Sequence, residues 1–161
     1  MDNTRNRNAL RQAAAGQRGF TLIEVLVTVI VLAIGLLGLA GLQLTALKYN
    51  HSAYMRSQAT ILTNDITDRM RANRDVATAG GYNIALGAVP NAVSCEGIGQ
   101  NCSNADMATA DLSEWKQQLA GLLPSGDGSI VQVGSTFTIT IQWDDSRGEQ
   151  APVQLSVETA I

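Results

Sequence analysis

The pattern of hydrophobic and polar positions divides the chain into a long N-terminal helix and a C-terminal globular part. An apolar run opens at Phe20, and the sequence has no charged residue from Val25 to Leu47. As a helix that stretch is about 35 Å long, which is enough to cross the roughly 30 Å hydrocarbon core of a bilayer. We therefore expect one helix over residues 20–73, with a transmembrane segment at about residues 22–47.

The second half of this helix has one apolar face, on which residues recur at spacings of four, three, four and four. Such a stripe is typical of a helix that packs on a globular domain. Asp65 and Arg69 form an i,i+4 pair on the solvent side, worth about 0.2–0.5 kcal/mol. The basic cluster at residues 69–74 suits a solvated helix end, and a nucleic-acid patch is the alternative. The stripe consists of Met55, Ala59, Leu62, Ile66 and Met70.

Residues 74–104 are rich in Gly, Asn, Ala and Ser, which predicts an irregular connection. A short helix is expected over residues 111–123, capped by Asp111 or Ser113 and ending before Pro124. Its apolar positions lie near one face and are expected to cover a sheet. They are Leu112, Trp115, Leu119 and Leu122.

Strand patterns follow over residues 130–161. Strict alternation of apolar and polar residues marks a strand with one buried face. With the long helix as cover, these segments predict an α+β fold with an antiparallel sheet of three or four strands. The expected inward positions are Phe137, Ile139, Ile141 and Trp143 in the central segment and Val153, Leu155 and Val157 in the last; residues 130–133 form the first candidate strand.

Charge is distributed unevenly along the chain. The first nineteen residues hold four arginines and one aspartate, which leaves seven basic and thirteen acidic residues for the remainder. A basic flank before an apolar span stays in the cytoplasm, so we expect the acidic part to be exported. The acidic balance also argues against non-specific nucleic-acid binding by the exported part.

Cys95 and Cys102 are close in sequence, within a Gly/Asn/Ser-rich context. In an oxidising compartment this spacing predicts a disulfide-closed loop, and two free thiols are the alternative. No metal site is expected, because no further Cys or His lies nearby to complete a ligand set.

The junction before the apolar run departs from an ordinary secretory signal. Its small residue, Gly19, stands before the hydrophobic stretch instead of after it. Cleavage between Gly19 and Phe20 would remove the basic leader, residues 1–19, and keep the helix as the new N-terminus. An uncleaved single-pass anchor is the alternative. Glu24 adds a second anomaly, since a charge in lipid costs about 2.5–3.5 kcal/mol on insertion scales.

The stretch GFTLIEVLV, residues 19–27, resembles the class III leader junction of type IV pilins. That resemblance implies a pilin-like fold, cleavage after Gly19 by a prepilin peptidase, and N-methylation of Phe20. It also gives Glu24 a docking role: the carboxylate pairs with the terminal ammonium of a neighbouring subunit, which offsets both desolvation costs. A carboxylate that snorkels to the cytoplasmic interface is the alternative.

Beyond the membrane run the chain is similar to the PilV-type minor pilins, also called type IV pilus modification proteins. The resemblance rests on residues 52–59 (SAYMRSQA), 65–73 (DITDRMRAN) and 143–145 (WDD). It implies a minor pilin near the pilus tip that primes assembly, anchored first by a single pass in the inner membrane with residues 74–161 as a periplasmic head, and later part of the extracellular pilus. The implied partners are other minor pilins, the major pilin, the prepilin peptidase and the inner-membrane assembly platform, with secreted adhesins as candidates at the tip.

Three other functions are weighed against this one. A type II secretion pseudopilin would use the same helix in a different machine. A DNA-uptake pilin is disfavoured by the acidic exported part. An enzyme is not expected, and neither is a cofactor: His51 has no cysteine nearby to form a dyad, and Asp144 and Asp145 are adjacent on a strand end, so their side chains point apart.

Overall fold

The computed structural model describes residues 19–91, 93–95, 101–146 and 148–161. The chain forms two compact units, Met1–Thr45 and Ala46–Ile161. Helix α1, Leu22–Ala72, runs through the boundary between them as one continuous helix. In the first unit, every described residue of α1 is exposed. Of the described residues, only the second unit therefore has a hydrophobic core.

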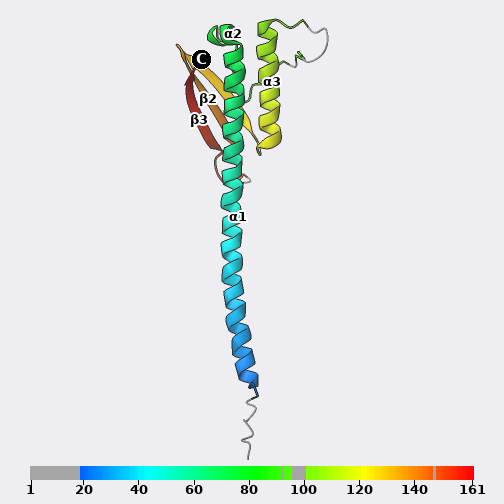
Figure 1. The fold of residues 1–161 in the computed structure, drawn as a ribbon, viewed down its shortest axis with the longest axis vertical. Helices are drawn as coiled ribbons and strands as arrows, with labels where there is room; N and C mark the ends of the chain where they lie inside the picture. Colours follow the sequence, from blue (N-terminus) through cyan, green and yellow to red (C-terminus); the bar gives the residue numbers. More distant parts are fainter. Residues whose placement is uncertain (1–18, 92, 96–100, 147) are drawn as a thin grey trace, which may run out of the picture. The chain divides into compact units, whose positions relative to one another are not determined.

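The second unit, which we call the head, consists of the C-terminal part of α1, two further helices and a sheet (Figure 1). Helix α2 is the short segment Arg74–Thr78, and α3 spans Asn104–Leu122. Three strands follow as an antiparallel meander in the order β1-β2-β3. Their bounds are Asp127–Val133, Thr136–Trp143 and Val153–Ala160. The α+β architecture expected from the sequence is confirmed, and its sheet has three strands.

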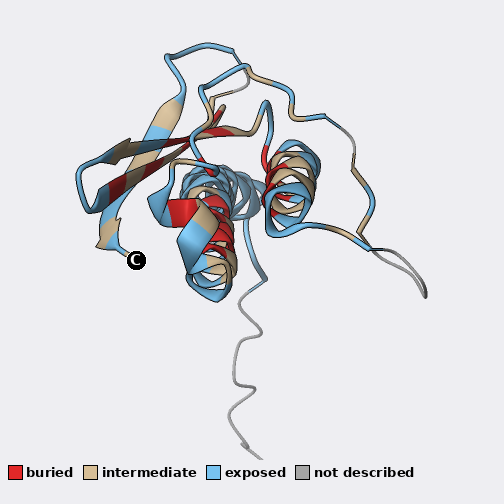
Figure 2. Cartoon of the chain, turned by 90° about the horizontal axis from the view of Figure 1, so that it is seen from above, coloured by how far each residue is buried: buried red, intermediate tan, exposed pale blue. Residues whose placement is uncertain are grey.

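The core lies where α1, α3 and the sheet meet. Figure 2 shows the buried residues of α1 and α3 on the sides that face each other and the sheet. The predicted stripe of α1 is buried from Met55 to Met70, and all four alternate apolar residues of β2 are buried. Alternation in β2 thus places one side of the sheet against the helices, because successive strand side chains point to opposite faces.

Helix α3 begins at Asn104, so the predicted start at Asp111 or Ser113 is too late. Ser103 is the N-cap, and it forms a reciprocal capping box with Asp106. The Asp106 amide donates to the Ser103 hydroxyl oxygen over 3.2 Å, and the Ser103 amide donates to the Asp106 carboxylate over 3.0 Å. Hydrogen bonds from the Ser103 hydroxyl and amide lower the pKa of the Asp106 carboxyl. A capping box satisfies two otherwise unpaired amides, which fixes the helix start.

Three smaller expectations also differ from the structure. Leu122 is 50% exposed, and Leu123 is buried in its place, because the helix ends at Leu122 and the backbone becomes extended at the next residue. Strand β1 begins at Asp127, three residues before the predicted first strand. Val157 on β3 faces the core as expected but is 37% exposed instead of buried, since β3 is the edge strand at the end of the sheet.

Lys116 and Asp127 join α3, β1 and the loop that contains Gly87. Lys116 Nζ donates to the Asp127 carboxylate and, over 3.2 Å, to the Ala85 carbonyl, while the Gly87 amide donates to the other carboxylate oxygen. Burial acts to raise the pKa of the Asp127 carboxyl, but hydrogen bonds from Lys116, Gly87 and Gly128 outweigh it and lower the pKa below the ordinary 3.8.

Asp127→Asn is expected to lower the stability of the head at neutral pH by about 1.5–3 kcal/mol, because it removes a charge-assisted hydrogen bond. A depressed folded-state pKa contributes stability above the unfolded value, and that contribution is lost as pH falls through the folded pKa. The gap between wild type and variant should therefore close as pH falls below 3.8. Urea unfolding of the full chain in detergent measures it. Asp68→Asn, at a side chain that is 75% exposed, is the matched control, and an equal gap there would contradict the prediction.

Candidate functional site

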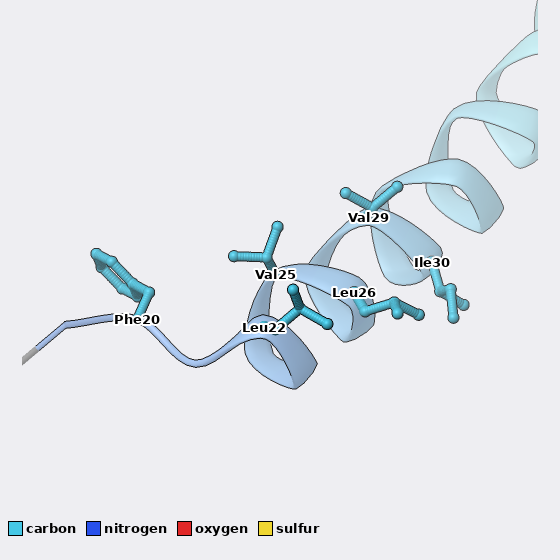
Figure 3. A pocket seen from close by; sticks show the side chains of 6 residues that line it. All are labelled: Phe20, Leu22, Val25, Leu26, Val29 and Ile30. Carbon is cyan, nitrogen blue, oxygen red and sulfur yellow. The ribbon is translucent and has the colours of Figure 1, made fainter.

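The first candidate site is the N-terminal end of α1, where the predicted junction lies. Gly19 and Phe20 are exposed and precede the helix, and Phe20 is 84% exposed. Figure 3 shows Phe20 on the segment ahead of the first turn, with its ring away from the helix. The peptide bond between Gly19 and Phe20 is thus outside regular secondary structure. Of the predicted leader, residues 1–19, only Gly19 is among the described residues.

Thr21 sets the start of the helix. The Glu24 amide donates to the Thr21 carbonyl over 3.1 Å and to the Thr21 hydroxyl oxygen over 3.3 Å. Thr21 therefore acts as an N-cap, and Glu24 lies at the third helical position, as in a Thr-x-x-Glu capping pattern. Sequence reasoning missed the role of Thr21, although this pattern is visible in the sequence.

Glu24 is exposed in the first turn of α1. Among the residues that the structure describes, no cation lies within ion-pair distance of its carboxylate. The positive end of the helix dipole stabilises an acid at this position by about 0.3–1 kcal/mol. On insertion scales a charge at the centre of a bilayer costs about 2.5–3.5 kcal/mol, which the helix end alone would not offset.

Apolar side chains at the N-terminal end of α1 form an uncovered surface that does not include Glu24 (Figure 3). Each is at least half exposed, and α1 contains a segment long and apolar enough to cross a membrane. Threonine side chains of α1 are satisfied within the helix: the Thr28 hydroxyl donates to the Val25 carbonyl over 2.8 Å, and farther along the Thr45 hydroxyl donates to the Gly41 carbonyl over 3.0 Å. This surface therefore suits lipid or other apolar helices. It consists of Phe20, Leu22, Val25, Leu26, Val29 and Ile30.

A charged cluster in the head is the second candidate. Arg69 donates from Nε to Asp65 over 3.0 Å and from Nη1 to Asp111 over 3.2 Å and Glu114 over 2.6 Å. The hydroxyl of buried Tyr82 donates to the other Asp111 oxygen over 2.6 Å. The Asp65–Arg69 pair, which was expected on the solvent side of α1, is thus part of a partly buried cluster. This cluster connects α1 to α3 and to the segment after α2.

The electrostatics of this cluster follow from these contacts. The hydrogen bond to Glu114 is the main cause that raises the pKa of Arg69, and the same bond lowers the pKa of Glu114. Burial, followed by the hydrogen bond to Asp111, raises the pKa of the Tyr82 hydroxyl. At neutral pH Arg69 and Glu114 are therefore charged, and Tyr82 keeps its phenol proton. Every polar group in it is engaged with another, so its role is to connect elements of the head.

Among the described residues, His51, Asp144 and Asp145 form no hydrogen bond or ion pair with one another. His51 is exposed on α1. Asp145 accepts a hydrogen bond from the Ser52 hydroxyl over 2.7 Å, whereas Asp144 accepts one from the Ser146 amide over 2.8 Å. Within the described ranges, no three His, Cys, Asp or Glu side chains are grouped so as to hold a metal ion.

The cysteines are joined. Cys95 and Cys102 form a disulfide with a Cα–Cα distance of 5.8 Å, so the free-thiol alternative does not hold in this structure. The bridge ends directly before Ser103, the N-cap of α3. It therefore closes the connection that leads into this helix.

Two family models match adjoining parts of the chain. Residues 15–40 match the prokaryotic N-terminal methylation motif, and residues 41–113 match the family described as Type IV pilin Tt1218. Searches of curated proteins and of solved structures found no match. The first match covers the junction and Glu24, and the second covers the rest of α1 and the first half of α3. Over these residues the chain is similar to type IV pilins and carries the prokaryotic N-terminal methylation motif.

Proposed function

We propose that this chain is a minor pilin of a type IV pilus, of the PilV type, which enters the filament near its tip and primes assembly. The observation that carries the proposal is Glu24, an acid without a partner among the described residues, on a helix whose N-terminal surface is uncovered. Assembly of pilins side by side supplies both the apolar cover and the partner charge.

Processing creates that partner. Cleavage between Gly19 and Phe20 removes the four leader arginines and frees an amine at Phe20. Methylation of an amine keeps its positive charge. Each mature subunit then offers one ammonium and one carboxylate, and each of these groups can pair with the opposite charge of a neighbouring subunit. Pairing from subunit to subunit is heterologous, and such contacts propagate along a filament.

The minor role rests on the three segments that resemble PilV-type proteins. Two of them meet in the fold, because Ser52 donates to Asp145 and so connects α1 to the segment after β2. The third supplies Asp65 and Arg69 to the charged cluster. These segments thus include contacts that support the head, which favours a common head architecture with that type of subunit.

The proposed route begins in the inner membrane. Basic residues in the leader favour its retention in the cytoplasm, so the head is placed in the periplasm. The disulfide agrees with an oxidising compartment. Partners along this route are the prepilin peptidase, the inner-membrane assembly platform, other minor pilins and the major pilin, with a secreted adhesin as a candidate at the tip.

Crosslinking at the helix end tests the proposal. A photoreactive residue at Leu22 or Ile23, both exposed next to Glu24, is expected to capture other minor pilins and the major pilin in intact cells. The matched control carries Glu24→Val as well, and its crosslinks should fall sharply because the docking pair is gone. Recovery of type II secretion subunits alone would reassign the chain as a pseudopilin of that system.

A further inference from the structure

The two edges of the sheet differ. The outer edge of β1 is covered by the segment after α2: Ile84 and Ile130 exchange backbone hydrogen bonds of 3.0 and 2.9 Å. The next outward amide, that of Gln132, donates to the Asn83 side-chain oxygen over 2.9 Å. β1 thus has its outward amides taken by this chain itself and is closed to a further strand.

The outer edge of β3 is open. Across the part of the chain that the structure describes, no hydrogen bond outside the β2–β3 ladder starts from a backbone amide of Val153–Ala160. In Figures 1 and 2, β3 forms the free side of the sheet, with β2 as its neighbour. Val157, on the face toward the core, is 37% exposed. An unpaired strand of this length with exposed apolar surface is a template for another strand.

Protection of this edge is slight. Glu158 is the one charged residue in β3. The polar side chains at the middle of the strand are directed to β2, since Ser156 shares a 2.9 Å hydrogen bond with Thr140 and Gln154 donates to Gln142 over 3.4 Å. They do not turn outward to block the edge. Natural sheets usually protect such edges with bulges, prolines or several charges.

Neither antiparallel pairing with a second copy nor a second copy in the same orientation fits the open edge. Antiparallel pairing of β3 with its own copy needs a two-fold axis perpendicular to the sheet, which would point the two α1 helices in opposite directions. Subunits inserted in one membrane share one direction. Two copies in the same orientation would instead bring β1 of one beside β3 of the other, because β1 and β3 both run antiparallel to β2. The covered edge of β1 prevents that contact.

We propose that β3 pairs with an edge strand of a different type IV pilin-family subunit, whose head has the same orientation and whose own first strand is open. This inference rests on the proposed function, because it requires neighbouring subunits in a filament. Main-chain hydrogen bonds join the two sheets, and the partner strand covers Val157 on the core side and presents a neutral or basic residue to Glu158. The contact is one-sided and cannot repeat between copies of this chain.

Residues on one row of the sheet provide the test. Val131, Thr138 and Glu158 lie side by side on the same face, with Val131 on the covered edge and Glu158 on the open one. A photoreactive residue replaces Glu158 in one full-length variant and Val131 in the other, and each is compared in intact cells with the variant that carries it at Leu22. We expect the Glu158 position to capture a different pilin-family subunit and the Val131 position to give only background.

Three results would overturn the inference and leave the proposed function standing: no capture from Glu158 although Leu22 captures pilins, capture of a second copy or of a protein outside the family from Glu158, or equal capture from Val131. Failure at Leu22 as well would reject both the proposed function and the strand pairing. The substituted side chains at Val131 and Glu158 are exposed, so neither variant is expected to unfold the head.

Discussion

A Glu24→Val variant is expected to be cleaved and inserted normally but to enter filaments about a hundredfold less than wild type. The reason is twofold. Valine removes the cost that a charge in the membrane adds to the unassembled state, which on insertion scales reaches about 2.5–3.5 kcal/mol at the bilayer centre. It also removes the partner of the neighbouring ammonium, so the assembled state loses its ion pair. Both changes favour the subunit that stays in the bilayer.

Sheared pili and membrane fractions from the same cells measure this effect, with the size of the mature protein as the readout for cleavage. Glu24→Gln separates charge from shape, since it keeps a similar side chain without the negative charge, and it should also assemble poorly. Val25→Ala, at an exposed apolar neighbour, is the matched control and should assemble well. Normal incorporation of Glu24→Val would refute the ion pair between Glu24 and the terminal ammonium of a neighbour. It would favour the alternative, in which the Glu24 carboxylate snorkels to the cytoplasmic interface of the membrane.

Local periodicity was enough to predict the elements that bury one continuous face. The stripe of α1 and the alternation in β2 each repeat over several turns or residues, so the core positions Ile66 and Ile139 could be assigned from the sequence. The junction at Gly19 and the position of Glu24 were likewise visible, because a processing signal acts on a short linear segment. Each of these features is set by a short local segment and depends little on contacts with distant parts of the chain.

The features that were missed depend on contacts between distant parts of the chain. Arg69 and Glu114 are 45 residues apart, and Tyr82 and Asp111 are 29 apart. Nothing in their local sequence indicates that they meet. Asp111 or Ser113 was expected to cap the helix, whereas the capping box at Ser103 starts it earlier. The Asp111 side chain instead lies mid-helix and accepts hydrogen bonds from Arg69 of α1 and from Tyr82.

A Trp115→Ala variant is expected to destabilise the head by about 3–5 kcal/mol. Trp115 is fully buried on α3, and its indole donates to the Leu62 carbonyl of α1 over 3.0 Å. Its ring packs so closely on Gly128 of β1 that a Cβ there would lie 2.4 Å from it. The Trp115 side chain thus connects α1 and α3 to strand β1. Small domains have about 5–15 kcal/mol in total, so the loss is a large share of the stability.

Urea unfolding of the full chain in detergent, followed by the fluorescence of buried Trp143, measures the loss. Trp115→Phe isolates the indole hydrogen bond, because it keeps much of the ring packing, and should cost about 1–2 kcal/mol. Leu122→Ala removes a half-exposed side chain from the same helix and should change stability by no more than about 0.5 kcal/mol. An unfolding midpoint for Trp115→Ala equal to that of Leu122→Ala would mean that α3 does not hold the head together. In cells, the unstable head should be degraded after normal cleavage at Gly19, because the junction lies in the other unit of the chain.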